Sequence, residues 1–98
     1  MCKYLLSDTC DREEQLIIVE ADSFSDMENV VITLMKDAMD DQSFDPATSE
    51  GQDDTWGYNS YPDINRISAW YNRNSGTDYD WYVLKLEDIR TVNAKELM

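Results

Sequence analysis

The stretch that decides the fold covers residues 23–41 and reads SFSDMENVVITLMKDAMDD. Apolar side chains recur in it at steps of three and four residues, at Phe24, Met27, Val31, Leu34, Met35 and Ala38. This spacing is typical of one face of an amphipathic helix. Ser23 can cap the first turn, because an acid follows three residues later. The sequence therefore predicts a long helix over residues 23–41, with one apolar side and one acidic side.

The residues before this helix, 2–22, predict a β-hairpin. A short first strand is marked by Leu5 and its neighbours, and the second contains Leu16, Ile17, Ile18 and Val19. Four apolar residues in a row favour a strand covered on both faces. The link between the strands is acidic, and we interpret it as a solvated loop in preference to a second acidic patch. Its acids are Asp8, Asp11, Glu13 and Glu14.

The residues after the helix divide into three parts. Residues 42–62 have weak periodicity and many turn formers, which predicts an irregular acidic segment. Residues 63–73 follow a proline and have apolar residues on one side, which predicts a second, shorter helix. Residues 79–88 alternate in character and predict a final strand, and residues 91–98 are expected to form a tail or a short extra turn. The expected fold is α+β: a single domain with three antiparallel strands and both helices on one face.

The charge of the chain is strongly negative and unevenly placed. The formal charge is −13, and residues 23–54 contain nine acids against the single base Lys36. This excess argues against binding nucleic acid or an anionic membrane through a basic patch, and it favours a basic protein as the partner. The acids expected to contact that partner are Asp26, Glu28, Asp37, Asp40, Asp41, Asp45, Glu50, Asp53 and Asp54. The alternative is that they are a solvated face that only keeps the protein in solution.

Enzymatic chemistry is not expected. The chain has no histidine, which removes the commonest general base and metal ligand. It has no glycine-rich phosphate loop, no paired-cysteine metal spacing and no calcium-loop spacing, so neither a cofactor nor a metal is expected. Cys2 and Cys10 are interpreted as free thiols in a reducing compartment. No apolar run is near eighteen residues and no signal pattern is present, so a cytoplasmic location without membrane contact is expected.

Aromatic residues gather in the second half of the chain, where eight of the eleven fall between Trp56 and Tyr82. A stacking platform for single-stranded nucleic acid would need lysines or arginines between the aromatic residues. Such basic residues are scarce, so we favour packing of the aromatic residues within the domain. Trp56, Tyr58 and Tyr61 provide an alternative partner-binding surface, because such residue types are enriched at binding hot spots.

One resemblance concerns the C-terminal half. The residues Ala69-Trp70-Tyr71-Asn72, then Gly76-Thr77-Asp78-Tyr79-Asp80-Trp81 leading into Tyr82-Val83-Leu84-Lys85-Leu86, resemble small proteins of phages and mobile elements. Those proteins similarly place Tyr-Asp-Trp before a last strand. The N-terminal strand followed by a Ser-capped helix is similar too, so the likeness covers about the outer two-thirds of the chain. Short acidic proteins of this kind include anti-CRISPR and anti-restriction proteins, some of which imitate DNA. The resemblance implies such a role without transferring any binding residue.

Two functional hypotheses result. In the first, the protein is an acidic inhibitor that binds the basic nucleic-acid-binding groove of a host defence protein, such as a CRISPR effector or a restriction enzyme, as a DNA mimic. Asp37 and Asp41 are four residues apart, a helical rise of about 6 Å that is close to the spacing of successive phosphates. In the second, the protein is an interaction module that uses the aromatic segment around Trp56 and Tyr61. A housekeeping protein that is acidic only for solubility is a third reading.

Overall fold

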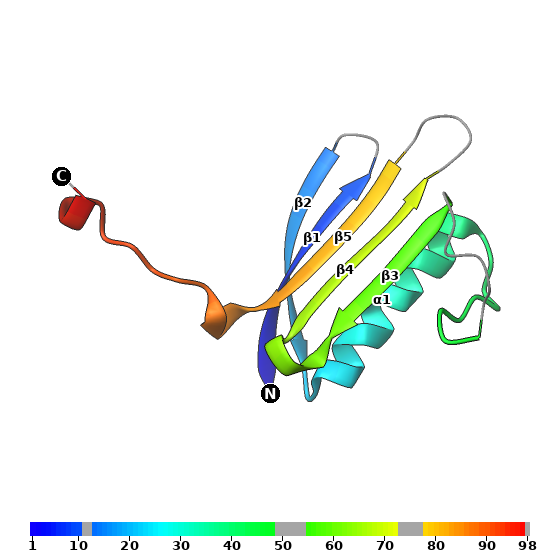
Figure 1. Cartoon of the computed structure of the whole chain (residues 1–98), viewed down its shortest axis with the longest axis horizontal. Helices are drawn as coiled ribbons and strands as arrows, with labels where there is room; N and C mark the ends of the chain where they lie inside the picture. The colour runs from blue at the N-terminus through cyan, green and yellow to red at the C-terminus, as the bar shows by residue number, and fades with distance from the viewer. Residues whose placement is uncertain (11–12, 49–54, 73–77, 98) are drawn as a thin grey trace.

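The computed structural model describes residues 1–10, 13–48, 55–72 and 78–97. Its strands and helix follow in the order β1 (Cys2–Cys10), β2 (Glu13–Ala21), α1 (Phe24–Met39), β3 (Trp56–Tyr61), β4 (Arg66–Asn72) and β5 (Asp78–Lys85). Short 3-10 helices occur at η1 (Pro62–Ile64), η2 (Leu86–Asp88) and η3 (Ala94–Leu97). Figure 1 shows α1 running beside the sheet, and the segment after η2 extending away from it.

The five strands form one antiparallel sheet in the order β2-β1-β5-β4-β3. The last strand, β5, lies in the middle and joins two hairpins, β1–β2 and β3–β4. Val83 of β5 is opposite Leu6 on one side and opposite Ile67 on the other, and all three side chains are buried. The centre of the sheet is therefore closed by the last strand of the chain.

The predicted fold class is wrong in two respects. The sheet has five strands and not three, and the described part of residues 63–73 forms β4 after a single 3-10 turn in place of a second α-helix. The helical start at Pro62 ends after one turn, because Asn65 adopts a left-handed conformation with φ of 54°. From Arg66 onward burial alternates, with Ile67 and Ala69 inside, which is the period of a strand. Ile64, Ile67 and Tyr71 also fit a helical spacing, and pairing with β3 and β5 decides between the two.

Two further boundaries differ from the prediction. The segment expected to be irregular over residues 42–62 contains β3, which pairs with β4 along its whole length. The final strand expected over residues 79–88 is β5, and η2 follows it. The first difference arises because β3 has few apolar residues of its own and is held by pairing with β4.

Helix α1 packs on one face of the sheet. Met27, Val31 and Met35 are fully buried on the side that faces the strands. The hydroxyl of Ser23 accepts a hydrogen bond from the backbone N–H of Asp26 at 3.1 Å and so caps the first turn. None of the described helices is long and apolar enough to cross a membrane.

Among the described elements, no α-helix lies on the opposite face of the sheet. Side chains alternate between the faces along each strand, so the neighbours in sequence of the buried residues lie on this open face. Leu5 and Leu84 are half-buried there, whereas Leu16, Ile18 and Tyr82 are 72%, 58% and 41% exposed. The prediction that β2 is covered on both faces is therefore wrong, because α1 covers one side and the strand lies at the sheet edge.

Candidate acidic interaction surface

The C-terminal end of α1 brings three acids together in a tight turn. Asp40 ends the helix in a left-handed conformation with φ of 55°, which aspartate tolerates better than most residues. The backbone N–H of Asp41 then donates to the carbonyl of Lys36 at 3.0 Å, a bond typical of a helix that ends in a reversed turn. Asp37 and Asp41 are therefore not on one regular helix, and their expected helical spacing of about 6 Å is wrong.

The carboxylates in this turn are held by local hydrogen bonds. Asp41 accepts from the backbone N–H and the hydroxyl of Ser43, at 3.0 and 2.6 Å. These two bonds lower the pKa of Asp41, so its carboxyl stays ionised. Asp37 accepts from the side-chain amide of Gln42 at 3.1 Å. The turn thus presents negative charges in defined orientations.

Asp45 continues the turn. Its carboxylate accepts a hydrogen bond from the backbone N–H of Ala47 at 2.9 Å. The preceding residue, Phe44, is buried and packs edge-on against Trp56 with ring centroids 5.0 Å apart. This aromatic contact fastens the segment after α1 to the start of β3, so the position of Asp45 is set by the core.

Asp8 of β1 lies beside the same end of the helix. It lines a hollow of about 260 Å³ together with Leu34, Asp37, Ala38, Tyr79 and Trp81. Burial raises the pKa of Asp8, and a hydrogen bond from Trp81 acts in the opposite direction. We name Asp8, Asp37, Asp40, Asp41 and Asp45 the acidic end. The prediction that Asp8 belongs to a solvated loop is wrong, since β1 extends to Cys10.

The sequence contained a signal for Asp8 that we did not use. Tyr4, Leu6 and Asp8 alternate with residues of the opposite face, and the first two are buried beneath α1. Strand periodicity therefore places Asp8 on the helix side, one step beyond Leu6. Strand periodicity does not predict that Asp37 is a neighbour of Asp8, because only the packing of α1 on the sheet brings Asp37 close.

Two other predicted acids lie at the opposite end of α1. Asp26 is exposed in the first turn of the helix. Glu28 faces β3, where its carboxylate accepts hydrogen bonds from the hydroxyls of Tyr58 at 2.9 Å and Ser60 at 3.0 Å. Burial, together with the hydrogen bond to Glu28 and its negative charge, raises the pKa of Tyr58 well above its usual value. Glu28 thus ties α1 to the sheet and is not part of the acidic end.

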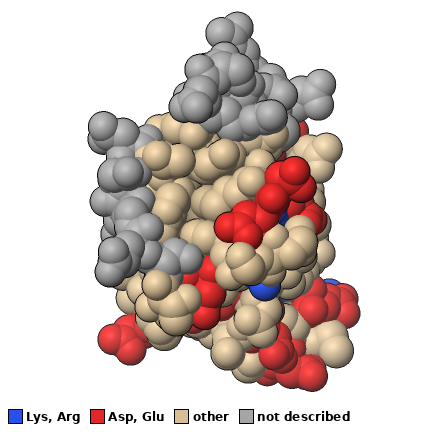
Figure 2. Space-filling model, turned by 90° about the vertical axis from the view of Figure 1, so that its right-hand side faces the viewer, with Lys and Arg blue, Asp and Glu red and all other residues tan. Residues whose placement is uncertain are grey.

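The remaining predicted acids, Glu50, Asp53 and Asp54, lie outside the described residues. Figure 2 shows acidic side chains in several separate groups, with uncharged surface between them and little exposed lysine or arginine. The acids of residues 23–54 that the structure describes are therefore divided between the two ends of α1.

The three aromatic residues of the alternative partner-binding surface are also separated from one another. Trp56 is only 7% exposed and belongs to the core, and Tyr58 is half-buried against Glu28. Tyr61 is 50% exposed, but it is an odd number of residues away from Trp56 and Tyr58 along β3. Its side chain therefore points to the opposite, open face of the sheet. The three residues do not form one exposed surface.

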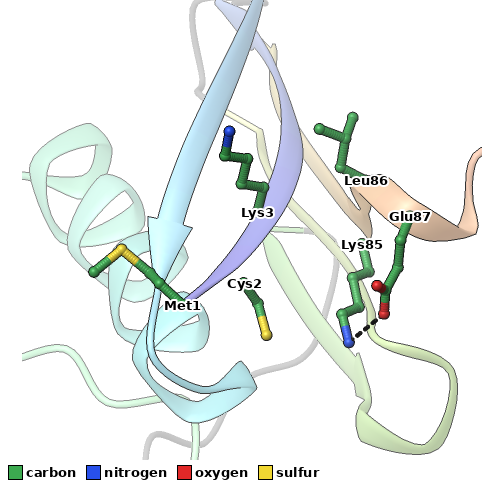
Figure 3. A pocket seen from close by; sticks show the side chains of 6 residues that line it. All are labelled: Met1, Cys2, Lys3, Lys85, Leu86 and Glu87. Atoms are coloured by element: carbon green, nitrogen blue, oxygen red, sulfur yellow. Dashed lines mark ion pairs between the residues drawn. The ribbon is translucent and has the colours of Figure 1, made fainter.

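Cations gather at the other end of the sheet. A second hollow, of about 360 Å³, is lined by Met1, Cys2, Lys3, Lys85, Leu86 and Glu87 (Figure 3). Lys85 pairs with Glu87 at 2.6 Å, and Cys2 is a free thiol. In the strands, Lys85 is opposite Tyr4 and Trp81 is opposite Asp8, so about 13 Å of strand separates this hollow from the acidic end.

Among the described residues, no group of three or more acids and cysteines is arranged to hold a metal ion. A comparison of the chain with protein-family models, with curated proteins and with solved structures finds no match.

Proposed function

We propose that the protein binds a basic, nucleic-acid-binding protein through the acidic end and competes with nucleic acid for that partner's groove. The observation that carries the proposal is the arrangement of Asp37, Asp40, Asp41 and Asp45 in one turn, where hydrogen bonds orient three of the four carboxylates. Preoriented charges lose little conformational entropy on binding, which favours a charged partner. A host defence protein, such as a CRISPR effector or a restriction enzyme, is the partner class that the proposal names.

The placement of charge supports this reading. Acids at a helix C-terminus oppose the helix dipole, so helix stability alone does not favour Asp37 and Asp40 there. Asp8 is partly buried, and burial disfavours the ionised form of its carboxyl. Groups that work against stability are typical of functional surfaces. No regular phosphate-like spacing is part of the proposal, because the helix ends before Asp41.

The test uses the immobilised protein and a nuclease-treated lysate of a bacterium with nucleic-acid-based defence. One variant carries Asp37→Asn, Asp40→Asn and Asp41→Asn. Its matched control carries Asp22→Asn, Asp63→Asn and Asp88→Asn, which remove the same number of exposed charges elsewhere. Proteins retained by the wild type are eluted, and their binding of a labelled DNA duplex is measured with and without added wild-type protein.

We expect the wild type and the control to retain a DNA-binding protein and to block its duplex binding, and the acidic-end variant to lose most of both. Because exposed ion pairs are screened, about 0.5 M NaCl should weaken retention strongly. Equal retention by the acidic-end variant, or retention that salt does not change, would contradict the proposal.

A further inference from the structure

Strand β2 forms an edge of the sheet that is apolar on both faces. Among the described strands it pairs only with β1, so no other described strand pairs with its outer backbone groups. Leu16 and Ile18 are 72% and 58% exposed on the open face, and Ile17 is 37% exposed on the helix face. Edge strands commonly carry lysine, proline or a bulge that prevents pairing with another chain. The described residues of β2 contain no lysine, proline or bulge, and their charged residues, Glu13, Glu14 and Glu20, lie toward the two ends of the strand.

Helix α1 leaves the middle of this edge uncovered. Glu28 points toward β3, and successive residues of a helix are rotated by about 100°. Val30 and Leu34 therefore lie on the flank of α1 away from β3, where Leu34 lines a hollow with Asp8 of β1 and Trp81 of β5. Ile17 stays 37% exposed on the helix face of β2. A strand added at this edge would therefore lie beside apolar side chains of β2 on both faces of the sheet.

The sequence of β2 is self-complementary about Ile17. From Glu14 to Glu20 it reads EQLIIVE, an apolar centre between two glutamates. We propose that two copies of the chain pair antiparallel through β2, with Ile17 on the two-fold axis, and form a continuous ten-stranded sheet. An isologous contact of this kind requires a surface that complements itself, and it closes at two copies.

The register follows from side-chain chemistry. When the helices of both copies lie on one face, only registers centred on a residue are allowed. Centring on Leu16 would place Glu14 opposite Ile18 of the second copy, and centring on Ile18 would place Leu16 opposite Glu20. Centring on Ile17 pairs Leu16 with Ile18 twice and leaves only Glu14 opposite Glu20. Lys3, which is opposite Glu20 on β1, supplies a cation beside that pair.

This register gives the association a salt dependence of defined sign. Like charges directly opposite each other in a sheet are destabilising, and each copy also carries a formal charge of −13. Added salt screens both repulsions, so the dimer should tighten as salt rises. The antiparallel pairing also places the two acidic ends at opposite ends of the ten-stranded sheet. Each therefore stays available, and binding at an acidic end has the opposite salt dependence.

The first experiment is sedimentation equilibrium of the full chain over a range of concentrations, in about 0.05 M and about 0.5 M NaCl. We compare the wild type with Ile18→Lys and with the control Ile64→Lys, whose parent residue is 54% exposed in η1. Circular dichroism verifies that each variant is folded. We expect a monomer–dimer equilibrium that is tighter at high salt. Ile18→Lys should raise the dimer Kd by ~10-fold or more, and Ile64→Lys should leave it unchanged.

The second experiment tests the register. The variant Glu14→Gln with Glu20→Gln removes the facing charges, and the control Glu87→Gln with Asp88→Asn removes two acids after β5. The first should tighten the dimer by about fivefold and the second by clearly less. A wild type that stays monomeric at both salt concentrations, a complex larger than a dimer, equal effects of the two lysine variants, or equal effects of the two charge variants would overturn the proposal.

Discussion

The carboxyl of Asp8 lies in a position that disfavours its ionised form. It lies at the rim of a hollow formed with the end of α1, and burial raises its pKa. A raised folded-state pKa means that ionising the group costs stability. That cost is absent where the carboxyl is protonated in both states and appears as the pH rises through the folded-state pKa. At neutral pH Asp8 therefore destabilises the fold.

We predict that Asp8→Asn stabilises the protein at neutral pH by up to about 0.5 kcal/mol. The asparagine keeps an oxygen that can accept from Trp81 and has no charge to bury. The gain should shrink as the pH falls toward the usual carboxyl value of 3.8, where the wild-type group is protonated too. Urea unfolding at several pH values measures it, with the exposed Asp63→Asn as control. A gain that stays constant with pH would contradict this explanation.

Glu28 and Asp41 show why a count of acids does not identify a surface. Both belong to the acid-rich residues 23–54, yet Glu28 accepts hydrogen bonds from β3 and Asp41 accepts them within its own turn. The first lies against the sheet and the second is exposed. Only residues of the second kind are available to a partner.

At the scale of elements, β3 and β4 are fitted to each other on the open face. Gly57 is buried opposite Trp70, and a Cβ at Gly57 would overlap the Trp70 indole. The missing side chain at this position is what allows the indole to lie flat across the strand. Glycine weakens a strand in general, so its presence here reflects close packing.

We predict that Gly57→Ala destabilises the protein by about 1–3 kcal/mol, because the indole or the strand must shift. Replacing Trp70 by leucine should remove the conflict, so the double variant should lose less stability than the sum of the two single variants. Thermal unfolding of the four proteins measures this coupling. A neutral or stabilising Gly57→Ala would show that the indole does not constrain the strand.

Elements differ in how far their sequence determines them. Helix α1 was predictable, because Met27, Val31 and Met35 have the helical period and Ser23 caps the first turn. The strand β4 was not, because Ile64, Ile67 and Tyr71 have the spacing of a helix whereas Ile67, Ala69 and Tyr71 alternate as in a strand. Its state depends on pairing with residues of β5 that are 6 to 18 positions away in the chain, from the pair Asn72–Asp78 to the pair Arg66–Leu84. Local spacing cannot supply that contact, and β3 was missed for the same reason.

At the scale of the whole molecule, acidic and basic side chains are placed apart. The acidic end and the hollow with Lys3 and Lys85 lie at opposite ends of the sheet. The two proposals use different parts of this arrangement and respond to salt with opposite signs. Binding of a basic partner should weaken as salt rises, whereas pairing of two copies should strengthen. One salt series on each complex therefore distinguishes them.

The C-terminal segment is an arm of the molecule. After η2 it extends away from the sheet (Figure 1), with Ile89 and Val92 about two-fifths exposed. We predict that ending the chain after Arg90 changes the free energy of unfolding by less than about 0.5 kcal/mol, because few core contacts are lost. Urea unfolding measures this. A loss above about 1 kcal/mol would show that the arm packs on the body.

The sequence by itself determined the helix, its buried face and the concentration of acid in residues 23–54. These are local properties, since side chains three and four residues apart meet within one helix and charge is read residue by residue. Only the tertiary structure decided that β5 closes a five-stranded sheet, that Asp8 joins Asp37, and that Glu28 is withdrawn into a contact with β3. Each of these depends on residues distant in the chain, whose proximity is set by strand pairing and by the packing of α1 on one face.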